Sequence, residues 1–152
     1  MVTRLPLSLF ALGCSRSFTV KNILWILAVA LFAGHELDAV AQAEWRLLYG
    51  LRALEPAQGR GWFIALHVPL CAALMLLAGH RQARIRRISR RSLAGFFVVH
   101  AGLHYRLQEH PLYLFGSLPS QVLIYACALA GFGYLLLDLG SRHDRTPVPT
   151  HH

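Results

Sequence analysis

A histidine and three carboxylates lie close together in residues 34–46, GHELDAVAQAEWR, at the end of an otherwise apolar segment. Imidazole nitrogens and carboxylate oxygens can bind a divalent metal ion or exchange protons. His100 and His104 lie four residues apart, a spacing that stacks both rings on one face of a helix and lets them hold one cation. Because ionisable groups are costly at membrane depth, we interpret these residues as a candidate functional site.

The composition of the chain indicates a membrane protein. The chain has 152 residues, of which 55% are hydrophobic and only 14% are charged, so it is expected to be one small integral membrane domain. The net charge of +8 would suit a nucleic-acid partner, but six of the 15 basic residues are arginines within residues 80–91, between two apolar segments. We expect these residues to form a short loop, because the positive-inside rule produces such basic loops between spans. We therefore expect contact with membrane lipids and no binding of nucleic acid.

Four apolar segments approach the length that a bilayer requires of a helix. We place the spans at about residues 21–41, 61–79, 92–108 and 119–139. Residues 1–20 are expected to be a cytoplasmic or interfacial leader, and residues 140–152 a disordered cytoplasmic tail. The predicted fold is therefore all-α, an integral membrane four-helix bundle in up-down order. Small residues at Ala126, Ala130 and Gly131 predict that a neighbouring helix approaches the fourth span closely.

The basic residues predict the orientation of this bundle. With four spans, the N-terminus, residues 80–91 and the C-terminal tail share one side, which holds 11 of the 15 basic residues. The positive-inside rule makes that side cytoplasmic, which gives an N-in/C-in multi-pass protein of a bacterial inner membrane. A rise of about 1.5 Å per residue then places His35, His67 and His104 about 18 to 21 Å from the cytoplasmic ends of their spans. This common depth, in the outer half of the membrane, predicts one shared site.

The predicted site combines imidazoles with acidic groups. Asp38 shares a helical face with His35, whereas Glu36 lies about a quarter-turn away. We expect Glu36 and Asp38 to serve as the catalytic general base or to hold a ligand in place. Glu44 and Trp45 look like an exit into the headgroups, beyond the lipid core. The predicted metal ligands are His35, His67, His100, His104 and Asp38, a nitrogen-rich set that suits zinc or iron.

These motifs also carry a resemblance to a known group of proteins. Four spans, with His35-Glu36-x-Asp38 ending the first, His67 opening the second and an HxxxH pair in the third, resemble small uncharacterised bacterial four-helix membrane proteins thought to bind metal. The resemblance covers about residues 22–138 and implies a class without a substrate. Some of these proteins have paired acids three and four residues after the first histidine, where this chain has Asp38 and Ala39. A mononuclear site is therefore favoured over a dinuclear one.

Three functions remain open from the sequence. The first is a membrane metalloprotein, whose enzymatic form would be a hydrolase or oxidoreductase acting on a lipid or other small apolar substrate. The second is a haem or electron-transfer protein with His35 and His104, or His67 and His100, as axial ligands. The third is a proton-coupled carrier or small-ligand binder without metal. Proteolysis is disfavoured because the chain has neither a GxSxG nor an HExxH motif. The sequence leaves open whether the chain forms a homo-oligomer.

Overall fold

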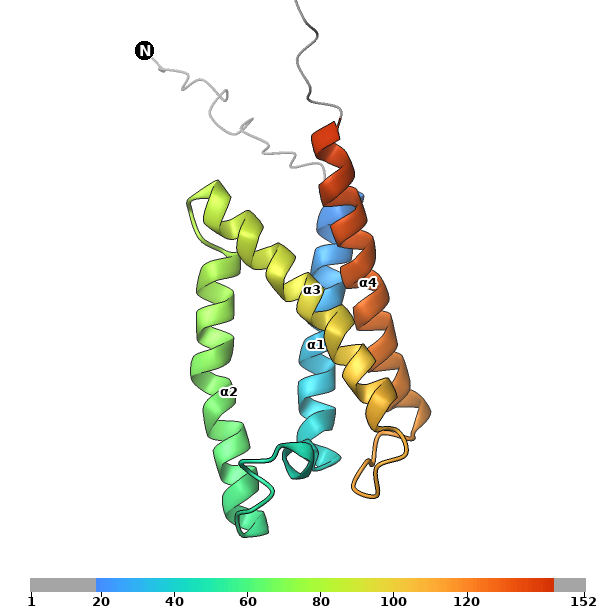
Figure 1. Ribbon diagram of the computed structural model, residues 1–152. Coiled ribbons are helices and arrows are strands. Elements are labelled where there is room, and N and C mark those ends of the chain that lie inside the picture. Colours follow the sequence, from blue (N-terminus) through green and yellow to red (C-terminus); the bar gives the residue numbers. More distant parts are fainter. Residues whose placement is uncertain (1–18, 144–152) are drawn as a thin grey trace, which may run out of the picture.

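The computed structural model describes residues 19–143, which form four α-helices and one short 3-10 helix without any strand (Figure 1). The elements are α1 (Val20–Ala41), η2 (Glu44–Leu47), α2 (Pro56–Ala78), α3 (Ala83–Leu107) and α4 (Leu118–His143). The predicted all-α class is therefore confirmed. The expectations for the leader up to residue 18 and for residues 144–152 lie outside the described part of the chain.

Three of these helices, α1, α2 and α4, are long and apolar enough to cross a membrane. Large apolar side chains such as Leu66, Met75 and Leu129 are exposed on their surfaces, which favours lipid over water as their surroundings. Helix α3 is not among the three, because its first turns read ARIRRISRR. That it also crosses the membrane, as expected for residues 92–108, stays a prediction.

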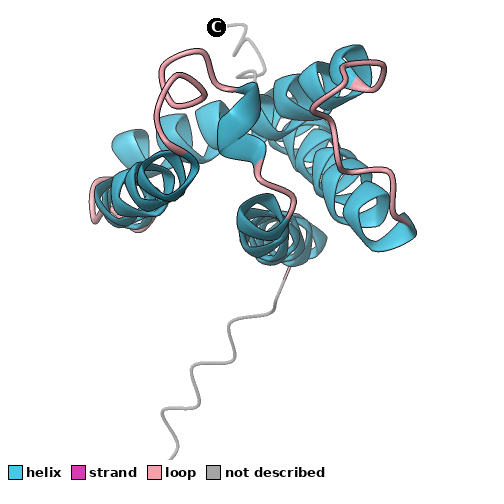
Figure 2. Ribbon diagram, turned by 90° about the horizontal axis from the view of Figure 1, so that it is seen from below, coloured by secondary structure: helices cyan, strands magenta, loops and turns pink. Residues whose placement is uncertain are grey.

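The helices are packed unequally. Helices α1 and α4 lie side by side along most of their length, and α3 crosses them obliquely (Figure 1). Helix α2 makes fewer contacts and stands farther from the pair. Figure 2, a view from below, shows that the helices diverge and do not form a closed ring of parallel rods. Helix α2 therefore packs less closely against the other helices than α1 and α4 pack against each other.

Two apolar clusters hold α1, α3 and α4 together. The larger one contains Trp25 and Ala28 of α1, together with Phe97 of α3 and further residues of α4. At Gly131 an added Cβ would lie 3.1 Å from the carbonyl oxygen of Ala94, so a larger residue would push α3 and α4 apart. The predicted close approach of a neighbouring helix is thus found at this glycine. The smaller cluster includes Ala39 of α1, Trp45 of η2 and Phe63 of α2, so it also joins α2 to the other helices.

Several boundaries differ from the expected ones. Helix α2 begins at Pro56, because proline is favoured in the first turn of a helix, where no partner exists for its missing N–H. Most of residues 80–91, expected to be a loop, belong to α3, and arginine is a good helix former. Helix α4 continues through His143, into the segment expected to be a disordered tail. The arginines are therefore presented on a rigid helix.

Candidate metal centre

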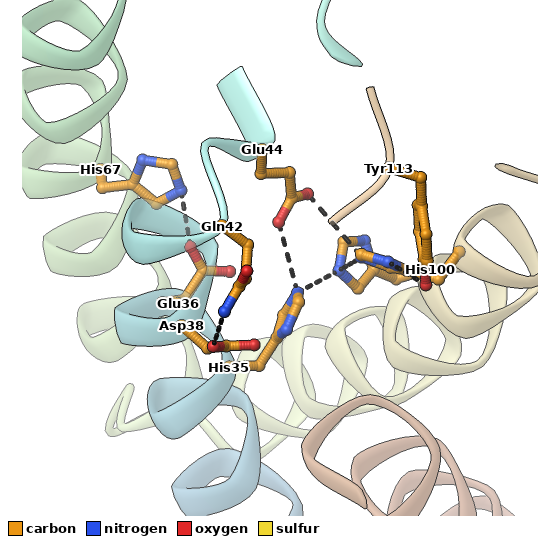
Figure 3. A network of polar contacts seen from close by, with 9 residues as sticks. His35, Glu36, Asp38, Gln42, Glu44, His67, His100 and Tyr113 are labelled. Carbon is orange, nitrogen blue, oxygen red and sulfur yellow. Dashed lines mark hydrogen bonds and ion pairs between the residues drawn. The ribbon is translucent and has the colours of Figure 1, made fainter. Parts of the chain in front are cut away.

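Three imidazoles and one carboxylate converge between α1, η2 and α3 (Figure 3). The Nε2 atom of His100 lies 2.8 Å from Nε2 of His35 and 3.1 Å from Nε2 of His104. The Glu44 carboxylate lies 3.5 Å from Nε2 of His35 and 3.9 Å from Nε2 of His104. Ligands about 2.0 to 2.1 Å from a tetrahedral zinc ion are about 3.4 Å apart, and these distances lie on both sides of that value. The ligand atoms of His35, Glu44, His100 and His104 all lie within 4.8 Å of one another, so this four-residue group could hold one metal ion.

Helix packing brings the histidines together. His35 is on the buried face of α1 and is 1% exposed. Phe32, one turn earlier, packs against Phe97 of α3 with ring centroids 4.9 Å apart, which sets the spacing between α1 and α3. Phe115, from the segment before α4, contacts the rings of both His35 and His104. Aromatic walls therefore hold the imidazoles in place, and the packing brings His35 together with the HxxxH pair.

Glu44 reaches the histidines because the chain turns back after α1. Ala43 adopts a left-handed conformation with φ 54° and ψ 44°, and the 3-10 helix η2 follows it directly. Trp45 is only 7% exposed and lies against Gly59 of α2, where an added Cβ would be 2.8 Å from the indole ring. The expected exit of Glu44 and Trp45 into the headgroups is thus not what the structure shows. Sequence reasoning missed Glu44 because neither glycine nor asparagine, the usual residues of a left-handed turn, marks this one.

The environment of Glu44 changes its acidity. Its side chain is 14% exposed. Burial, followed by the charges of Glu36 and Asp38, raises the pKa of Glu44 from 4.5 to about 7. A carboxyl group with such a pKa can bind a cation after losing its proton at neutral pH, or exchange that proton there.

His67 does not belong to the four-residue group. Its Nε2 atom lies 2.7 Å from Oε2 of Glu36, and its Nδ1 lies 2.6 Å from the carbonyl oxygen of Phe63. A carbonyl can only accept, so Nδ1 carries a proton, and one further proton must lie between Nε2 and the Glu36 carboxylate. His67, predicted as a metal ligand, and Glu36, predicted as a general base, therefore form a separate proton-sharing pair.

Asp38, predicted both as a ligand and as a catalytic group, also lies outside the four-residue group. Its Oδ1 atom accepts a hydrogen bond from Nε2 of Gln42 at 3.1 Å. Its Oδ2 atom and Nδ1 of His35 are both buried without a hydrogen-bond partner among the described residues. The two side chains are three residues apart on α1 and are neighbours in Figure 3. Asp38 therefore lies beside His35 on α1, but the described residues show no hydrogen bond between the two side chains.

Tyr113 contacts the opposite side of the cluster. Its hydroxyl oxygen lies 3.3 Å from Nδ1 of His104, and burial raises the pKa of Tyr113 above its usual value of 10.0. The hydroxyl therefore stays protonated at neutral pH, and its oxygen can accept a hydrogen bond from the Nδ1–H group when the lone pair of His104 Nε2 faces the cluster. Sequence reasoning had no signal for this contact, since Tyr113 comes from the connection before α4.

A cavity of about 750 Å³ opens beside the cluster. It lies between α2 and the opposite faces of α1 and α3, and leucines and phenylalanines supply most of its walls, among them Leu70, Leu74 and Phe96. Five polar side chains near the metal centre also line it: Glu36, Glu44, His67, His100 and His104. The cavity thus joins an apolar chamber to the imidazoles and carboxylates.

Residues 21–141 match the family of unknown function DUF6713. The matched segment contains His35, Glu44, His100 and His104 and nearly the whole of the four helices. No curated protein and no solved structure matches the chain. The chemistry must therefore be argued from the site itself.

Proposed function

The chain belongs to the DUF6713 family of unknown function, and from the geometry of its site we propose that it is a membrane-embedded metalloprotein. One observation carries the proposal: His35, Glu44, His100 and His104 bring their ligand atoms within 4.8 Å of one another. The three histidines hold the ion through Nε2, and Glu44 supplies an oxygen ligand. Three imidazoles and one carboxylate suit zinc or iron.

A cation explains this arrangement better than hydrogen bonds among the side chains alone. Nε2 of His100 lies within 3.1 Å of two other Nε2 atoms. In a neutral imidazole, Nε2 carries either one hydrogen or one lone pair, so Nε2 of His100 cannot form a full hydrogen bond with both neighbours. At least one of the two nitrogen pairs is therefore left without a hydrogen bond. A divalent ion would accept all three lone pairs and neutralise the buried Glu44 carboxylate.

The cavity supports an enzymatic role on an apolar substrate. A lipid or other small apolar molecule would enter the chamber between α2 and α3 and place its polar group near the ion. An ion bound there would supply Lewis-acid or oxygen-activating chemistry, which is the chemistry of hydrolases or oxidoreductases. Glu36 and His67 line the same cavity and share a proton, so this pair would deliver a proton to the substrate or remove one from it.

We place the helices in a bacterial inner membrane in up-down order, with both termini on the cytoplasmic side. Three helices long and apolar enough to cross a membrane support the membrane location. The arginines at the start of α3 support the orientation, because basic residues favour the cytoplasmic side. The metal centre then lies in the outer half of the bilayer.

A second candidate is a metal-free proton carrier, which the proton-sharing pair of His67 and Glu36 favours. The haem alternative has less support. Axial imidazoles bind on opposite faces of a flat macrocycle. The rings of His35 and His104 instead have centroids 5.0 Å apart among packed aromatic rings, and His67 is engaged by Glu36.

Metal analysis of the purified full chain tests the proposal. The wild-type protein should retain about one zinc or iron ion per chain, and His100→Ala/His104→Ala should lose it, because two of three imidazole ligands are gone. The matched control His80→Ala/His110→Ala also removes two histidines but none of the four-residue group, and should retain the ion. Equal metal content in wild type and in His100→Ala/His104→Ala would reject the metal site. A haem absorption band would instead favour the haem alternative.

A further inference from the structure

A second cavity, of about 660 Å³, lies at the other end of the helices from the metal centre. The first turns of α1 and α3 and the ends of α2 and α4 surround it. Lys21, Arg86, Arg87 and Arg90 line it, together with one carboxylate, that of Asp138. The cavity is therefore strongly basic, in contrast to the apolar chamber beside the metal centre.

The single carboxylate is already used by two cations. Asp138 is 5% exposed and lies 2.8 Å from Nζ of Lys21. Its other oxygen accepts a hydrogen bond of 2.6 Å from Nε of Arg91. Within residues 19–143, no ion pair connects a carboxylate to Arg86, Arg87 or Arg90. These three guanidinium groups thus face the cavity with uncompensated charge.

Neutral contacts hold two of these arginines in place. Arg86 donates a hydrogen bond of 2.9 Å to the carbonyl oxygen of His80. Arg90 donates one of 3.0 Å to the carbonyl oxygen of Ala78, and its guanidinium lies 5.2 Å from the centre of the Trp25 ring. Such contacts orient the side chains without cancelling their charge. The guanidinium groups are therefore partly preorganised for an anion.

The start of α3 adds to the positive potential. The first turn of α3 contains no acidic residue, and Gln82 makes no capping hydrogen bond with its side chain. Helix starts carry partial positive charge and are stabilised by anions, whereas this one bears arginines. Arg86 and Arg90 are also four residues apart, a spacing at which like charges on a helix repel. A bound anion would relieve both unfavourable interactions.

We propose that this basic cavity binds a phosphate group, carried by the headgroup of an anionic phospholipid or by a soluble phosphate ester. Guanidinium groups match phosphate oxygens in bidentate geometry. Trp25 and Ile26 line the same cavity and supply apolar contacts for the part of an amphiphile next to its headgroup. Basic pockets between membrane helices take up anionic headgroups in this way. The site is independent of the metal centre.

The test compares ligands on the full chain in neutral detergent. Phosphatidylglycerol should raise the temperature of thermal unfolding, and phosphatidylcholine, which has no net charge, should not. The triple variant Arg86→Ala/Arg87→Ala/Arg90→Ala should weaken the apparent affinity for phosphatidylglycerol about 100-fold. The control Arg81→Ala/Arg84→Ala/Arg106→Ala loses the same charge outside the cavity and should keep the wild-type affinity.

Glycerol phosphate serves as a third ligand, to identify the source of the phosphate. If it stabilises the wild-type chain as well as phosphatidylglycerol does, the site takes soluble esters; weaker stabilisation assigns it to lipid. Should the triple variant fail to fold, Arg87→Ala decides, because Arg87 is exposed and its loss should weaken binding about fivefold. The proposal would be overturned if both triple variants bound phosphatidylglycerol equally weakly, or if neither phosphatidylglycerol nor glycerol phosphate stabilised the wild-type chain.

Discussion

At the scale of single residues, Glu44 should give the metal-free protein a distinctive pH dependence. Its pKa is raised from 4.5 to about 7 by burial and by neighbouring carboxylates, so the folded chain binds this proton more tightly than the unfolded chain does. The stabilisation from Glu44 is therefore fully present below pH 4.5 and is lost as the pH rises to about 7. Relative to Glu44→Gln, metal-free wild type should become less stable over that range.

Thermal unfolding in detergent, with chelator present, measures this difference between the two variants. Comparing the variants at each pH cancels the titration of the histidines to first approximation. Saturating metal should reverse the slope, because the ion binds the ionised carboxylate and stabilises it as the pH rises. A pH-independent difference with chelator would contradict the raised pKa of Glu44.

The residue scale also shows what the sequence could reveal about the site. His35, His100 and His104 were predictable as a group, because a regular rise per residue converts sequence position into depth within each helix. His67 has a similar predicted depth, but it belongs to α2, which packs least closely with the other helices, and it pairs with Glu36. The depth of a residue along its helix does not specify the distance between helices, so only the packing of the helices in the structure shows which group each imidazole contacts.

At the scale of elements, the left-handed turn at Ala43 should control whether the metal centre is complete. A β-branched residue tolerates this conformation poorly, whereas glycine adopts it without strain. Ala43→Val should therefore displace Glu44 and reduce metal content as far as Glu44→Gln does, with a loss of stability of about 1 to 2 kcal/mol. Elemental analysis and thermal unfolding measure both effects.

Ala43→Gly is the matched control, since it changes the same position but fits the left-handed conformation. It should bind metal as the wild type does. If Ala43→Val also keeps its full metal content, the turn does not position Glu44, and the three histidines hold the ion without it.

The helices themselves differ in how well sequence predicts them. Long apolar segments mark α1, α2 and α4, because the bilayer demands both length and low polarity. The start of α3 was missed because charge in residues 83–91 indicates exposure to water or headgroups and does not distinguish a loop from a helix. Glu44 was missed for a related reason: one backbone conformation at Ala43 reverses the chain direction, and alanine rarely adopts it.

At the scale of the whole molecule, we expect the two ends of the helices, each with its own cavity, to be accessible from opposite sides of the membrane. The positive-inside rule favours the arginine-rich start of α3 on the cytoplasmic side, and the metal centre would then lie toward the outer surface. Gly50 and Arg81 are both exposed and lie near opposite ends of α2, and nothing lies within 4 Å of a Cβ added at Gly50. A cysteine at either position should therefore report the side without disturbing the fold.

Labelling with a membrane-impermeant maleimide in spheroplasts measures this orientation. In a background with Cys14, Cys71 and Cys127 replaced by alanine, Gly50→Cys should react in intact spheroplasts, and Arg81→Cys only after the membrane is permeabilised. The reason is the arginine cluster, whose six charges oppose transfer across the membrane from the cytoplasm. The reverse pattern would place the basic cavity outside and the metal centre toward the cytoplasm. An apolar substrate would then have to reach the ion from the inner leaflet, through the same chamber between α2 and α3.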